Sequence, residues 1–173
     1  MARRNWSRTL GLLAIITILS TGTALFAQRG QRSGAQKSDE KPTAKVRFGR
    51  WKMEQNAAPP VSNIMTYEPF GDGGMKVTVA TVNAQGQKSQ WSYETLFDGV
   101  FRPVTGQEGS ETAVEFINAK STRIQNKRNG KVNQVVINTL TEDNNTINNE
   151  YVRLDDQGRI TGVTHAVYHR IME

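Results

Sequence analysis

Hydrophobic and polar residues alternate along most of the chain after Phe48, and this period of two restricts the fold more than any other feature. In residues 75–81, Met75, Val77 and Val79 fall on one face of a predicted strand. Successive side chains of a strand point to opposite faces, so this alternation predicts half-buried strands. After Phe48, no window of ten or more residues shows the periodicity of an amphipathic helix. The chain is therefore predicted to be all-β.

Turn residues separate these strands at short intervals. Asp98-Gly99 and Asn129-Gly130 are dipeptides that supply the positive φ angles of tight hairpins. Connections this short join antiparallel neighbours, because a parallel crossover needs about a dozen residues or more. Closing such a meander removes its two bare edges. We predict an antiparallel up-and-down β-barrel of eight to ten strands, with an open sandwich as the alternative. The ten expected strands lie near residues 47–53, 61–69, 74–83, 88–97, 99–104, 111–118, 121–128, 131–142, 146–154 and 160–171.

Residues 1–27 have the features of a secretory signal peptide. A basic N-terminus precedes an apolar run over residues 10–19, and small residues follow it. Cleavage is expected after Ala27, with Ala24 as the second choice and an uncleaved anchor as the alternative to cleavage. The mature protein is expected to be secreted or periplasmic, with no stable membrane insertion once the signal is removed.

The positive charge of the chain is concentrated near its N-terminus. The formal net charge is +6, yet residues 51–173 hold 12 basic and 14 acidic side chains. A basic patch on a folded face is therefore not indicated, and no nucleic-acid partner is expected. Residues 28–46 are polar and are predicted to form a disordered linker. The barrel domain is predicted over residues 47–173, as a monomer.

The first predicted strand contains a Gly-x-Trp motif, Gly49-Arg50-Trp51. This motif, at the start of an all-strand chain, resembles the signature of the lipocalin and fatty-acid-binding (calycin) barrels. The resemblance covers about residues 48–171. The turn phrases at residues 67–73 and 98–106 resemble secreted bacterial lipocalin-like proteins whose role is undefined. The resemblance implies that Trp51 plugs the closed end of the barrel and that an Arg near the chain end covers it. Arg170 matches that role, with Arg153 as the rival.

Catalytic and metal chemistry find little support in the sequence. The chain has no cysteine and only 2 histidines. His165 and His169 lie four residues apart on one strand, about 13 Å, which is too far to share one metal ion. No nucleophile motif or phosphate-binding glycine loop is present. We therefore expect no enzyme activity, no metal and no cofactor, and a solvent-facing or hydrogen-bonded histidine pair.

Asparagine is frequent late in the chain, at Asn118, Asn126, Asn129, Asn133, Asn138, Asn144, Asn145, Asn148 and Asn149. Two interpretations remain open: a polar binding face, or a solvated outer face with long polar hairpins. The second is preferred here, because Asn is common in turns and poor in strands.

The leading functional hypothesis is a small, mostly apolar ligand held in the barrel lumen. The alternative is a non-enzymatic structural or interaction module of the cell envelope with a filled barrel. A barrel of this size either packs its interior solid or keeps room for one ligand. The candidate ligand-binding residues are the apolar members of the alternating runs: Met75, Val77, Val79, Trp91, Tyr93, Phe97, Val114 and Phe116.

Overall fold

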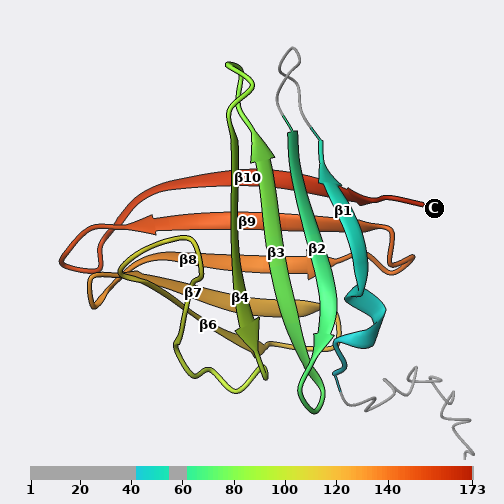
Figure 1. Cartoon of the computed structure of the whole chain (residues 1–173). Helices are drawn as coiled ribbons and strands as arrows, with labels where there is room; N and C mark the ends of the chain where they lie inside the picture. Colours follow the sequence, from blue (N-terminus) through green and yellow to red (C-terminus); the bar gives the residue numbers. More distant parts are fainter. Residues whose placement is uncertain (1–41, 55–61, 173) are drawn as a thin grey trace, which may run out of the picture. The chain divides into compact units, whose positions relative to one another are not determined.

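The structure, a computed structural model, describes residues 42–54 and 62–172, which form an antiparallel sheet curled into a barrel (Figure 1). Apart from its strands, this part of the chain has one short 3-10 helix, η1 (Lys45–Arg47). The predicted all-β, up-and-down barrel is confirmed. The segment predicted to be a signal peptide, residues 1–27, lies outside the described residues. The strands are β1 (Gly49–Met53), β2 (Ser62–Phe70), β3 (Gly74–Val82), β4 (Lys88–Thr95), β5 (Arg102–Pro103), β6 (Ser110–Phe116), β7 (Ser121–Arg128), β8 (Lys131–Leu140), β9 (Thr146–Leu154) and β10 (Ile160–Arg170).

Strand β3 shows how the period of two produces the barrel wall. Val77 and Val79 are buried, whereas Lys76 and Thr78 beside them are partly exposed. One face of the strand therefore packs inward and the other meets solvent. The same alternation on neighbouring strands gives a continuous inner surface. In Figure 1, β1–β4 cross in front of β6–β10, and the inner faces of these two layers enclose the interior.

The strand order makes the barrel almost closed. Sequence neighbours pair with each other, and the first strand also pairs with the last, through Trp51 opposite Arg170. A seam remains where β4 meets the segment after β5. Two backbone hydrogen bonds between Ser92 and Thr105, 2.8 and 3.0 Å long, bridge this seam. It is the least hydrogen-bonded junction in the wall.

A buried tryptophan closes one end of the barrel. Trp51 is fully buried, and the guanidinium Cζ of Arg170 lies 4.1 Å from the centre of its ring. Arg170 also donates hydrogen bonds to the backbone oxygens of Val46 (2.7 Å), Phe48 (2.6 Å) and Asn144 (3.0 Å). This one side chain therefore covers the indole ring and holds together the segment before β1 and the β8–β9 turn.

Helix η1 fits beneath the same tryptophan. The indole Nε1 of Trp51 donates a 2.9 Å hydrogen bond to the backbone oxygen of Arg47. Ala44 is 2% exposed and packs in the core. Ala44 and Lys45 fall within the segment that the sequence placed in the linker, so the fold includes the last residues of that segment.

Candidate ligand-binding site

A cavity of about 580 Å³ lies inside the barrel. Pockets for small molecules typically measure about 300–1,000 Å³. Exposed residues at the strand ends, among them Arg128, Arg153 and Thr161, contribute to its lining. The cavity therefore opens at the end where the β7–β8 and β9–β10 hairpins turn, opposite the end plugged by Trp51.

Strands β2, β3 and β4 supply an apolar wall. Met65, Val77 and Val79 line the cavity beside Trp91 and Tyr93. The rings of Trp91 and Tyr93 are stacked, with centroids 6.1 Å apart and planes 16° apart. Four of the eight candidate residues from the sequence thus lie together on this wall: Val77, Val79, Trp91 and Tyr93.

The other four candidates are not among the residues that line the cavity. Met75 and Val114 are buried in the core. Phe97 stacks on Phe116, with ring centroids 4.2 Å apart. The period of two does not reach Phe97, because β4 ends at Thr95 and Phe97 has a positive φ of 58°. Ligand contact by any of the eight residues stays a prediction.

Strands β8 and β9 supply a polar wall, where the preferred interpretation of a solvated outer face is wrong for the buried Asn138 and Asn149. Asn126 and Asn133 also line the cavity. Asn138 is 1% exposed, Asn149 is 5% exposed, and both line the cavity. Asn138 Nδ2 donates a 2.7 Å hydrogen bond to Asn149 Oδ1, which satisfies buried amide groups that would otherwise be costly. A signal was present in the sequence: Asn138 lies two residues from both Val136 and Leu140, which are buried on the same face.

Arg47 is a buried cation beneath this polar wall, and the sequence analysis did not identify it. Its side chain is 1% exposed and donates hydrogen bonds to Asn138 Oδ1 and, at 2.6 Å, to the backbone oxygen of Lys120. Burial lowers the pKa of Arg47, while the nearby Tyr67 and Tyr93 raise it. Within residues 42–54 and 62–172, no carboxylate forms an ion pair with Arg47.

The chain has 4 tyrosines, and every one of them lines the cavity. Burial raises the pKa of Tyr67 to about 12, against a smaller lowering by Arg47. Burial also raises the pKa values of Tyr93 and Tyr168 far above the ordinary range. These phenols are therefore neutral hydrogen-bond donors at physiological pH. The hydroxyl of Tyr93 has no hydrogen-bond partner in the part of the chain that the structure describes.

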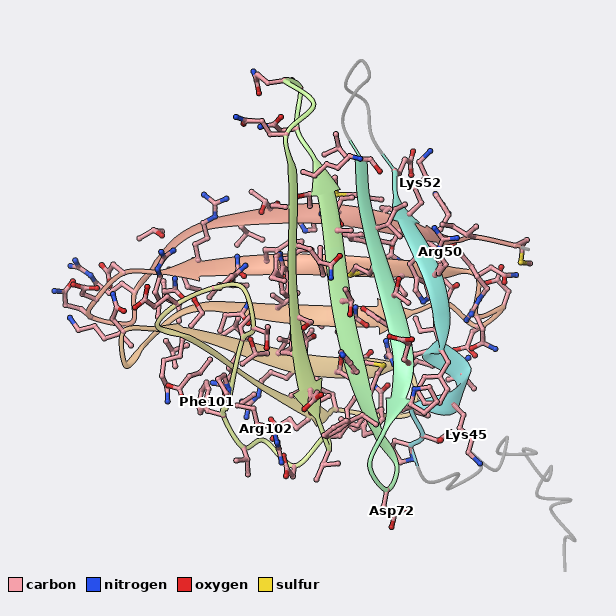
Figure 2. The ribbon with its side chains drawn as sticks, in the orientation of Figure 1. Lys45, Arg50, Lys52, Asp72, Phe101 and Arg102 are labelled. Atoms are coloured by element: carbon pink, nitrogen blue, oxygen red, sulfur yellow. The ribbon has the colours of Figure 1, made fainter. Side chains whose placement is uncertain are left out.

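The cavity mouth is predominantly basic. Lys127, Arg128 and Arg153 line it, with Glu111 as the one acidic lining residue. Lys127 Nζ lies 3.6 Å from Glu111 and 3.6 Å from the ring centre of Phe101. Figure 2 shows Phe101 on the segment that leads into β5. Arg153 lies here rather than over Trp51, whose ring Arg170 covers.

The histidines lie on the outer face of the barrel, away from the cavity. His165 Nε2 is 3.6 Å from Glu150, and His169 Nε2 is 3.2 Å from Glu54. All four side chains are more than half exposed. The described residues hold no group of three or more side chains suited to a metal ion. Within the same residues, no helix is long and apolar enough to cross a membrane.

The cavity can hold a small molecule in a defined orientation, because its two walls differ in chemistry. The β2–β4 wall offers apolar contact, and the β8–β9 wall offers amide and phenol groups. We find no nucleophile paired with a general base among the lining residues, which is the arrangement that covalent hydrolysis requires.

Known structures share this barrel. An asparagine-to-alanine variant of the fluorescent protein UnaG aligns with a TM-score of 0.53 and 12% sequence identity, over 76% of this chain and 100% of the UnaG chain. An asparagine-to-glutamine variant aligns with a TM-score of 0.50 and 14% identity, over 73% and 96%. No protein-family model and no curated protein matches the sequence. At this identity the likeness concerns the fold alone, and the fold is the lipocalin-like, calycin β-barrel that the Gly-x-Trp motif predicted.

Proposed function

We propose that this protein binds one small molecule, with a mostly apolar body, in the lumen of its barrel. The observation that carries the proposal is the cavity of about 580 Å³ with an apolar wall on β2–β4. An acyl chain or a small ring system fits such a wall, because burying apolar surface gains about 25 cal/mol per Å². The likeness of the barrel to UnaG is consistent with small-molecule binding.

We further propose that the protein works outside the cytoplasm as a non-catalytic carrier or receptor. The support is the basic start and apolar run of residues 1–27. The absence of cysteine suits an exported barrel that needs no disulfide, because a core of this size is stable without one. The alternative, an envelope module with a filled barrel, is disfavoured by the volume of the cavity.

Titration with an apolar dye tests the proposal. N-phenylnaphthylamine should bind with micromolar affinity and quench tryptophan emission, because Trp91 lines the cavity. Val79→Phe should weaken dye binding by filling the lumen, since Val79 is 4% exposed and lines it. Val163→Phe is the matched control, because Val163 is 46% exposed on β10 and does not line the cavity.

Circular dichroism should show that each variant is folded, since overpacking a core costs about 1–3 kcal/mol. If Val79→Phe does not fold, Tyr93→Ala takes its place, because truncation there enlarges the site and should change dye affinity. A wild-type protein that is folded yet does not bind the dye would contradict the proposal and favour the filled barrel.

A further inference from the structure

Exposed apolar side chains gather at the closed end of the barrel. Among the described residues, seven large hydrophobic side chains are exposed, and four of these lie in η1, in the loop that follows β4 and in the β6–β7 turn. The four are between 37% and 54% exposed: Val46, Leu96, Val100 and Ile117. None of them lines the cavity. They are therefore a feature of the surface and not of the lumen.

Contacts between these segments place the four side chains on one surface. The loop after β4 contacts the end of β6, because Phe97 stacks on Phe116 with ring centroids 4.2 Å apart. The β6–β7 turn contacts η1, because Arg47 donates a 2.6 Å hydrogen bond to the backbone oxygen of Lys120. In Figure 1, η1, the end of β4 and the β2–β3 hairpin lie on the lower side of the barrel. We call this surface the closed-end patch: Val46, Leu96, Val100 and Ile117.

The charged groups near the patch leave it available to an anionic surface. Asp98 is paired with Arg102, and Glu115 is paired with Arg123, so these two acids contribute little net negative charge. Lys45 in η1 is exposed, and none of the described carboxylates forms an ion pair with it. Figure 2 shows Lys45 on the same lower side as the end of β4.

The segment before η1 adds positive charge where it joins the barrel. The described part of the chain begins at residue 42, three residues before η1, so this segment joins the barrel at the closed end. Its residues 28–41 carry four basic side chains against two acidic ones: Arg29, Arg32, Lys37 and Lys41, against Asp39 and Glu40. Basic side chains beside a membrane surface are attracted to anionic lipid headgroups.

The chemistry of the patch suits a lipid surface better than a protein partner. The centres of protein interfaces are enriched in aromatic residues and Arg, whereas Leu and Val are seldom the residues that carry the binding energy. The exposed side chains here are all aliphatic, and their aromatic neighbours Phe97 and Phe116 stack on each other. Aliphatic groups on separate loops need no pocket of matching shape in a fluid bilayer.

We propose that the closed-end patch docks this protein on an anionic lipid bilayer, with the mouth of the lumen directed away from the membrane. The aliphatic side chains enter the boundary between headgroups and acyl chains, and the cations of η1 and of the segment before it meet the lipid phosphates. The barrel then lies on the membrane and does not span it. The inference goes beyond lumen binding and does not depend on a lumen ligand.

Flotation with lipid vesicles tests the proposal on the protein exported by a bacterial host. The protein should float with vesicles of phosphatidylcholine and phosphatidylglycerol, and less with phosphatidylcholine alone or at high salt, because salt screens the headgroup charge. Ile117→Asp and Leu96→Asp should each weaken partitioning about tenfold or more, since each places a charge where an aliphatic group enters the bilayer.

Ile160→Asp is the matched control. Ile160 is 66% exposed at the start of β10, beside the mouth and opposite the patch. Its replacement introduces the same charge and should change partitioning by less than about twofold. Circular dichroism and binding of N-phenylnaphthylamine in the lumen should show that all three variants are folded.

A site-specific label reports which end meets the lipid. The chain has no cysteine, so Ile117→Cys and Ile160→Cys can each carry one environment-sensitive nitrobenzoxadiazole group. On addition of anionic vesicles, the emission of the label at position 117 should shift to the blue and increase. The emission of the label at position 160 should stay as it is in water.

Several outcomes would overturn the inference. The wild-type protein fails to float, or floats unless Ile160 is replaced, which would place docking at the mouth. Flotation that persists in both patch variants, with no shift of the label at position 117, would assign binding to the N-terminal segment alone. Self-association in the ultracentrifuge that Ile117→Asp abolishes, without vesicle binding, would make the patch a protein interface. Each of these results leaves lumen binding to be decided by the dye titration.

Discussion

The guanidinium of Arg170 lies over the ring of Trp51, with its Cζ 4.1 Å from the ring centre, and the two residues are paired on β10 and β1 at the closed end. Trp51 opens the barrel in sequence, and Arg170 ends its last strand. Their contact therefore joins the two ends of the folded chain. The hydrogen bonds of Arg170 to three backbone oxygens make the same residue a clamp on the surrounding loops.

A double-mutant cycle should measure this contact. Trp51→Ala should lower the free energy of unfolding by about 3–5 kcal/mol, as truncation of a buried Trp does. Arg170→Ala should lower it by about 2–3 kcal/mol, because stacking and charged hydrogen bonds are lost together. The double variant should lose about 0.5–2 kcal/mol less than the sum. Urea unfolding provides the measurement, and strict additivity would show that the stacking contributes nothing.

Lys52→Ala is the control for this cycle. Lys52 lies on β1 beside Trp51 but is exposed, and Figure 2 shows it on the outer side of that strand. Its replacement should change the free energy of unfolding by no more than about 0.5 kcal/mol, as is usual at the surface.

Alkaline pH should destabilise the barrel through Tyr67. Its pKa of about 12 in the folded protein exceeds the value of about 10 in an unfolded chain. Between these pH values the unfolded state has released the phenolic proton and the folded state still holds it. The stabilisation is therefore complete below about pH 10 and is lost as pH rises toward 12, at about 1.4 kcal/mol per pH unit.

Urea unfolding of wild-type protein and Tyr67→Phe at pH values between about 8 and 11.5 checks this, because lysines titrate in both proteins alike. The variant should lose stability less steeply above about pH 10. Parallel curves for the two proteins would show that Tyr67 ionises with an ordinary pKa.

Gly106 should be intolerant of a side chain because of the barrel seam. Its φ is +85°, and a Cβ there would approach the backbone oxygen of Gln90 to 2.7 Å. Gly86 has a similar φ of +76° but open space around it. Gly86→Ala should therefore cost about 1–2 kcal/mol from backbone strain. Gly106→Ala should cost at least about 1 kcal/mol more, because the wall must also move.

Amide hydrogen exchange should locate that extra cost. In Gly106→Ala, the amides of Ser92 and Thr105, which bridge the seam, should exchange faster than in Gly86→Ala. Equal unfolding free energies and equal exchange rates in the two variants would mean that the seam accommodates a methyl group without opening.

Export should remove the signal peptide. Mass spectrometry of the protein recovered from the periplasm or medium of a bacterial host should give a mature N-terminus at Gln28, or at Leu25 if cleavage follows Ala24. An intact N-terminus in the membrane fraction would favour the anchor instead. The residues concerned lie outside those that the structure describes.

Much of the fold was readable from local pattern. Alternation in a strand is a property of the backbone itself, so Val77 and Val79 were placed on the same face as each other before any contact was known. The turn at Asn129-Gly130 was equally predictable, because its two positive φ angles, 49° and 81°, are what that dipeptide favours. Local alternation does not predict where the side chain of Phe97 points. Strand β4 ends at Thr95, and beyond it successive side chains no longer alternate between the two faces.

The polar side of the lumen depended on closure of the barrel. Arg47 lies in a stretch of basic residues that, taken alone, is typical of a solvated segment, and Asn138 is of a type common on surfaces. Only when β1 pairs with β10 and Trp51 seals the end does the helix η1 turn Arg47 inward against Asn138. The sequence alone was enough to predict the strands, the turns and the barrel, because these follow from backbone periodicity. The buried cation and its hydrogen bond to Asn138 were decided by the tertiary structure, because they join residues 91 positions apart that only the closed barrel brings into contact.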